Sequence, residues 1–139
     1  MKKYLNLSFA YAIAAMAGGV FYWEFTKFQG YSGVTALGKV HTHLFLLGML
    51  VFLVTALYAA HTDLAKVKTF RVFLWIYNIG APLTAVMMLI RGVFQVLGTP
   101  LSAAVNASIS GIAGIGHILT GTGMILLLVS LRKLAKDGN

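Results

Sequence analysis

The sequence predicts an all-α integral membrane protein with four transmembrane helices, and two observations support this fold class. Of the 139 residues, 59% are hydrophobic and 10% are charged, whereas a soluble domain usually has about 25% charged residues. A helix needs about 20 apolar residues to cross roughly 30 Å of hydrocarbon, and four such stretches use most of the chain. We therefore expect one transmembrane domain over residues 1–139, a four-helix bundle, with no room for a second domain.

The first span is expected over residues 5–23, directly after Met1, Lys2 and Lys3. A basic start followed by an apolar run is also typical of a cleavable signal peptide. The apolar run continues to Trp23, however, and so we expect a retained helix. Residues 24–38 mix charged, polar and glycine residues and are expected to form the loop that follows.

The remaining spans are expected over residues 40–60, 72–97 and 109–131. A polar turn over residues 61–71 separates the second span from the third, and the stretch 98–100 (Gly-Thr-Pro) breaks the helix before the fourth. Pro82 lies inside the third span, where proline removes a helical hydrogen bond, and we expect a kink there.

Lysine and arginine residues are unequally divided between the two sides of the membrane that these spans define. Of the 11 Lys and Arg residues, only Lys27, Lys39 and Arg91 fall on one side. The other side carries Lys2, Lys3, Lys66, Lys68, Arg71, Arg132, Lys133 and Lys136. Because Lys and Arg are enriched in cytoplasmic loops, both termini are expected in the cytoplasm. The cations thus indicate topology in a lipid bilayer, and we expect no nucleic-acid partner.

His41 and His43 are the strongest candidate site residues, because ionisable side chains inside a span are costly and mark functional sites by default. Two residues on an α-helix are separated by a rotation of about 200°, so the two imidazoles are expected on nearly opposite sides of the second span. They cannot readily chelate one ion together, and each needs its own partner. The chain has no cysteine, so any metal or haem must be held without thiolate ligands.

His117, in the fourth span, is the third candidate. At about 1.5 Å per residue, His117 lies about 12 Å below the start of its helix and His43 about 6 Å below Lys39. Both belong to the outer half of the membrane and can share a layer. The alternative for each histidine is a buried neutral imidazole bonded to a backbone carbonyl or a threonine. His61, at the cytoplasmic boundary, is expected to be only interfacial.

Lys39 and Arg91 lie near the outer ends of the second and third spans. In one interpretation both side chains reach the outer interface, or Arg91 pairs with Glu24. In the other they face the carboxylates of a bound ligand. The glycines of the fourth span either permit close helix packing or leave flat space for a planar group such as a porphyrin.

The segment from His41 to Met49, HTHLFLLGM, resembles a known pattern. The whole chain is similar to small four-span membrane proteins of the bacterial cytoplasmic membrane whose function is unassigned. The segment itself is distantly similar to the catalytic subunit of heme–copper oxidases. In that subunit, a His-x-His pair on one helix binds two different metal centres.

The resemblance implies a homotrimer, because the oxidase subunit has twelve helices in three groups of four with pseudo-threefold symmetry. It also implies that His41 of one protomer and His43 of the next hold a b-type haem, with the propionates toward Lys39 and Arg91. His117 is an alternative ligand within the same protomer. The chain has no paired histidines and no histidine near a tyrosine to match the oxidase copper ligands. Oxygen reduction is therefore not expected.

The resemblance favours a haem-binding membrane protein for electron transfer or for redox or gas sensing, with a redox partner that the sequence does not identify. A second interpretation is a carrier or storage protein that binds zinc or copper through His41, His43 and His117, since neutral imidazole suits both ions. A third is a structural accessory subunit without a ligand, which leaves three intramembrane histidines without a purpose.

Overall fold

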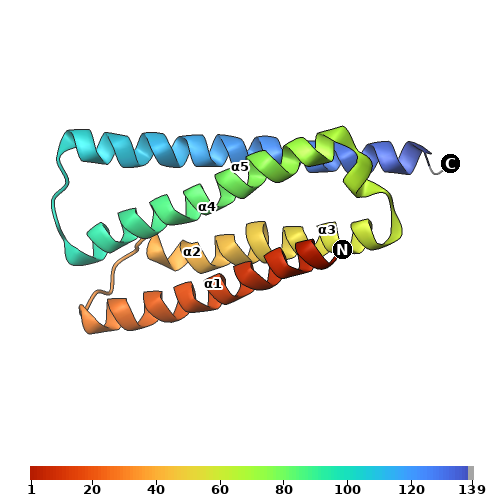
Figure 1. The fold of residues 1–139 in the computed structure, drawn as a ribbon. Helices are drawn as coiled ribbons and strands as arrows, with labels where there is room; N and C mark the ends of the chain where they lie inside the picture. Colours follow the sequence, from red (N-terminus) through yellow and green to blue (C-terminus); the bar gives the residue numbers. More distant parts are fainter. Residues whose placement is uncertain (138–139) are drawn as a thin grey trace.

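The computed structural model describes residues 1–137, and its regular elements are all helical. They are α1 (Lys2–Phe28), α2 (Leu37–His43), the π-helical segment η1 (Leu44–Leu50), α3 (Val51–His61), the short 3₁₀ helix η2 (Leu64–Lys66), α4 (Lys68–Leu97) and α5 (Ala103–Asp137). Because α2, η1 and α3 follow one another without a break, they form one long helix, which we call span two (Leu37–His61). The described chain thus has four helices that are long and apolar enough to cross a membrane (Figure 1).

The helices extend beyond most of the predicted span boundaries. α1 continues to Phe28, so the loop predicted over residues 24–38 covers only residues 29–36, and α5 begins at Ala103 instead of near residue 109. The four helices contain 27, 25, 30 and 35 residues, which corresponds to lengths of about 40, 37, 45 and 52 Å. Apolar length reports only the hydrocarbon core of roughly 30 Å, whereas helical hydrogen bonding continues into the interface. The predicted spans were therefore too short.

The four spans of the predicted helix bundle lie side by side in an open row (Figure 1). α1 packs on span two, span two packs on α4, and α4 packs most extensively on α5. Within the described chain, α1 and α5 make no extensive contact with each other. Both termini and the α3–α4 connection lie at the same end of the molecule along the helix axes (Figure 1). We call it the basic end, because it carries the eight cations of one predicted side. The α1–α2 and α4–α5 connections form the loop end.

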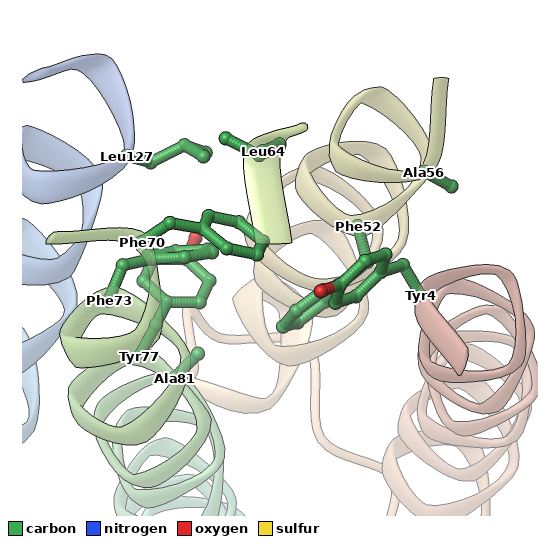
Figure 2. Close-up of a cluster of buried hydrophobic side chains, with 9 residues drawn as sticks. All are labelled: Tyr4, Phe52, Ala56, Leu64, Phe70, Phe73, Tyr77, Ala81 and Leu127. Atoms are coloured by element: carbon green, nitrogen blue, oxygen red, sulfur yellow. The ribbon is translucent and has the colours of Figure 1, made fainter. Parts of the chain in front are cut away.

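A buried cluster joins all four spans in the half of the molecule nearer the basic end (Figure 2). Tyr4 of α1 packs edge-on against Phe70 of α4, with ring centroids 5.5 Å apart. Phe52 of span two packs edge-on against Tyr77 of α4 at 6.0 Å, and Leu127 of α5 adjoins the cluster. In lipid, helices gain little from hydrophobic burial, so close van der Waals packing of this kind holds them together. This cluster makes the basic half the densely packed half.

A π-helical turn begins in span two directly after His43. The backbone carbonyl groups of this wider turn bond to neighbouring helices. The Tyr77 hydroxyl donates to the Leu47 carbonyl at 2.8 Å, and the Ser8 hydroxyl donates to the Met49 carbonyl at 2.8 Å. Gly48 lets α1 approach, because a Cβ at this position would overlap the ring of Tyr11. π turns are rare in proteins, and those that occur are often found at functional sites, so this part of span two is a candidate position for one.

Candidate functional site

A pocket at the loop end contains two of the three candidate histidines. Its volume is about 410 Å³, and span two, α4, α5 and the loop before α2 form its wall. The lining residues are Val34, Thr35, Ala36, Lys39, His43, Met88, Gln95 and His117. His43 is half-buried, and His117 is exposed on the side of α5. His43 and His117 thus line one pocket, which we call the histidine pocket.

Both histidines of this pocket are held in the same way. The Nδ1 atom of His43 lies 2.8 Å from the Lys39 carbonyl, and that of His117 lies 2.8 Å from the Ala113 carbonyl. A neutral imidazole that faces a carbonyl oxygen through Nδ1 carries its proton there, which leaves a free lone pair on Nε2. Backbone carbonyl groups commonly fix metal-ligating histidines by this bond. The hydrogen bond expected of a structural histidine therefore also prepares each ring to bind a metal.

The pocket lies close to the loop end of the helices. Arg71 and Arg91 are 20 residues apart on α4, or about 30 Å, which is comparable to the thickness of a hydrocarbon core. His117 precedes Arg132 by 15 residues, or about 22 Å along α5, and His43 lies about 6 Å beyond Lys39 along span two. Both imidazoles thus belong to the loop half of the molecule.

His41 lies on a different side of span two. Its ring stacks on Tyr22 of α1, with centroids 6.4 Å apart and planes 15° from parallel, and it faces Gly19. Its Nδ1 atom is buried and has no hydrogen-bond partner within the described chain. The predicted separation of His41 from His43 is confirmed. The structure therefore does not bring His41 together with His43 and His117 within one chain.

The two candidate cations occupy neighbouring pockets. Lys39 lines the histidine pocket itself. Arg91 lines a second pocket of about 270 Å³, and Gln95 borders both pockets. Arg91 donates from Nη2 to the Ser110 hydroxyl at 2.7 Å. Its predicted alternative partner, Glu24, forms no ion pair with it, since the described residues contain one ion pair, Lys66–Asp63.

Among the residues of the histidine pocket that sequence reasoning missed, two lie on α4. Met88 and Gln95 both project from α4 into its wall, and the Gln95 side chain accepts a hydrogen bond from the Ala36 backbone at 2.8 Å. Met88 precedes Arg91 by three residues and so lies about 4 Å deeper, close to the depth of the histidines. Counting depth from the arginines would have indicated Met88. That the Met88 side chain points into this pocket could be known only from the packing of the helices.

The polar groups of the pocket include two imidazoles from two helices and the Lys39 ammonium at its mouth. Within the described part of the chain, no three His, Cys, Asp or Glu side chains gather closely enough to hold a metal ion.

The fold and the site together describe a small all-α protein whose four helices are apolar enough to cross a membrane and which carries a histidine-lined pocket at one end. The chain belongs to the family described as "Protein of unknown function (DUF2871)", which matches residues 1–134. No curated protein and no solved structure matches the chain. The expected membership of a small four-span family agrees with this result. The more distant similarity to heme–copper oxidases stays a prediction.

Proposed function

We propose that the protein is a membrane haem-binding protein that holds a b-type haem in the histidine pocket. His43 and His117 would hold the haem iron through their imidazoles, and Lys39 would pair with a haem carboxylate. The observation that carries the proposal is the pair of imidazoles in one pocket, each bonded through Nδ1 to its own helix with Nε2 free. A haem with two histidine ligands supplies one-electron transfer, with the iron positions closed to gases.

The proposal places both ligands in one chain. The resemblance to the oxidase subunit implies a different pair, His41 of one protomer and His43 of the next. Because His41 stacks on Tyr22 of its own chain and His43 shares a pocket with His117, we favour the pair within one chain. Lys39 orients the ligand through charge, since it is exposed at the mouth of this pocket.

The test is the optical spectrum of the full-length protein purified in detergent from haem-replete cells. We expect a strong Soret band and, on reduction, a sharp α band of low-spin haem. His43→Ala and His117→Ala should each abolish the low-spin spectrum, because each removes one axial ligand. His61→Ala is the matched control, since His61 is exposed at the end of span two outside the pocket, and it should leave the spectrum unchanged.

His41→Ala distinguishes the two ligand pairs. An unchanged spectrum supports His43 with His117, whereas loss of the low-spin signal in His41→Ala and its retention in His117→Ala would support ligation between protomers. A colourless preparation would contradict haem binding altogether.

A second candidate function is copper binding, which one observation favours. Met88 lines the same pocket as His43 and His117, and a thioether with two imidazoles is a donor set that suits Cu(I). Metal analysis of the purified protein decides between the candidates. One copper per chain without porphyrin, lost in Met88→Leu, would replace the haem proposal.

We further propose that the protein is a homo-oligomer, most simply a trimer, in the bacterial cytoplasmic membrane with both termini in the cytoplasm. The concentration of eight cations at the basic end supports this orientation. The open row supports assembly, because α1 and α5 each keep one side uncovered by their own chain. A redox partner must exchange electrons with the haem, and its identity follows from no residue of the chain.

A further inference from the structure

We propose that the pocket around Arg91 binds the phosphate group of an anionic phospholipid at the loop-end face of the membrane. This pocket, which we call the arginine pocket, has a volume of about 270 Å³ and lies between the outer parts of α4 and α5. It is lined by Arg91, Phe94, Gln95, Thr99, Leu101 and Asn106. The inference is independent of haem binding.

The arginine is held in place while most of its donors stay free. Ser110 donates from its hydroxyl to the Asn106 carbonyl at 2.9 Å and accepts a hydrogen bond from Arg91 Nη2 at 2.7 Å. These two hydrogen bonds hold the guanidinium of the half-buried Arg91 against α5. A guanidinium has five N–H donors, and one bond to a neutral hydroxyl neither uses the others nor balances the charge.

The other polar side chains of the pocket are those that bind an anion. Thr99 offers a hydroxyl and Asn106 an amide N–H group. The Gln95 oxygen is occupied by the Ala36 backbone, so its amide N–H groups are the part left for a ligand. No carboxylate lines the pocket. The first turn of α5, which contains Asn106, adds the positive end of a long helix dipole.

The depth of the pocket selects a lipid phosphate over a solute. Arg91 lies about 30 Å from Arg71 along α4, which is the thickness of the hydrocarbon core. Its guanidinium is thus at the level of the headgroups. Phe94 and Leu101 border the pocket and offer apolar contact to the glycerol and the first carbons of the acyl chains. A phosphodiester enters such a site with its two free oxygens toward the arginine fork.

Native mass spectrometry of the full-length protein titrated with phosphatidylglycerol tests the proposal. We expect one tightly bound lipid per chain, with the apparent Kd raised about tenfold in Arg91→Gln, because a hydrogen-bonded charge is lost. Lys27→Gln is the matched control, since Lys27 is a single exposed cation at the same end of the molecule, and its Kd should change less than about twofold. Asn106→Ala should weaken binding by a smaller factor and protects the test if Arg91→Gln does not fold.

Three outcomes would overturn the proposal. Equal losses in Arg91→Gln and Lys27→Gln would show that binding follows net charge. Full displacement of the lipid by millimolar inorganic phosphate would show that the pocket takes a free anion. Unchanged lipid binding with reduced haem retention in Arg91→Gln would assign Arg91 to a haem carboxylate. Because haem content is measured in the same samples, failure of the haem proposal leaves the lipid result readable.

Discussion

At the scale of single residues, the glycines of α5 separate into two groups with different roles. A Cβ at Gly116 would lie 2.7 Å from the Thr84 hydroxyl and 3.0 Å from the Thr84 backbone nitrogen. At Gly114, a Cβ would meet nothing within 4 Å. Both glycines precede His117 on α5, and Gly116 is its direct neighbour, so close approach of α5 to α4 at Gly116 positions the histidine relative to the pocket wall. The sequence alone cannot distinguish the glycine at a close helix contact from the glycine at an open position.

Gly116→Ala should lower the free energy of unfolding by about 1–3 kcal/mol, because α5 must move away from the α4 backbone. Gly114→Ala should leave it unchanged or raise it by up to about 1 kcal/mol, since alanine is the better helix former and the site is open. Unfolding of both variants by titration with a denaturing detergent measures the difference. Equal destabilisation in the two variants would contradict the close contact at Gly116.

The histidines show what residue spacing can and cannot predict. The rotation of about 200° per two residues correctly separated His41 from His43, and the rise per residue put His43 and His117 toward the same end of their helices, where they line one pocket. Both are properties of any α-helix. Spacing does not determine which helix lies on which side, so the partners of each ring, Tyr22 for His41 and the α5 pocket for His43, required the packed structure.

At the scale of elements, the π turn in span two is the feature that the sequence did not predict. Its residues, Leu44–Leu50, are as apolar as an ordinary transmembrane helix and give no local signal. The turn exists because groups far away in the sequence stabilise it, chiefly the Tyr77 and Ser8 hydroxyls that bond to its carbonyls. The span boundaries were underestimated for the related reason that apolar length does not report helical length.

Tyr77→Phe should lower the free energy of unfolding by about 1–2 kcal/mol, because the Leu47 carbonyl loses its hydroxyl donor in an apolar environment while the ring contacts remain. Tyr58→Phe is the matched control. Tyr58 lies on span two with 46% of its surface exposed, and its substitution should change stability by less than about 0.5 kcal/mol. Denaturation of both variants in detergent gives the comparison. If the two changed stability equally, the hydroxyl of Tyr77 would not support the π turn.

At the scale of the whole molecule, α1 and α5 are the two outer helices of the open row, and each has one side uncovered. Contact of α1 of one copy with α5 of the next would close a ring of copies. Met16 of α1 and Ile118 of α5 are 55% and 69% exposed; Met16 lies about 21 Å from Lys2 along α1, and Ile118 lies about 21 Å from Arg132 along α5. The two side chains therefore lie at one level and can meet across such an interface.

The chain has no cysteine, so engineered cysteines can test this arrangement without background. The double variant Met16→Cys/Ile118→Cys should form cross-linked trimers with a short bis-maleimide, while neither single variant should cross-link. Met16→Cys/Val129→Cys is the control, because Val129 lies about 5 Å from Arg132 along α5 and therefore much nearer the basic end than Met16. Cross-linked dimers in a single variant would indicate a two-fold interface instead of a ring.

The buried cluster of the basic half has a consequence for biogenesis. It includes Tyr4, close to the first residue of the chain, and Leu127, close to the last. Ribosomal synthesis delivers these two ends at opposite times, so the cluster stays incomplete until the final span has entered the bilayer. The aromatic contacts among α1, span two and α4 can form before α5 is made. The packing of Leu127 against them is then the step that completes the basic half.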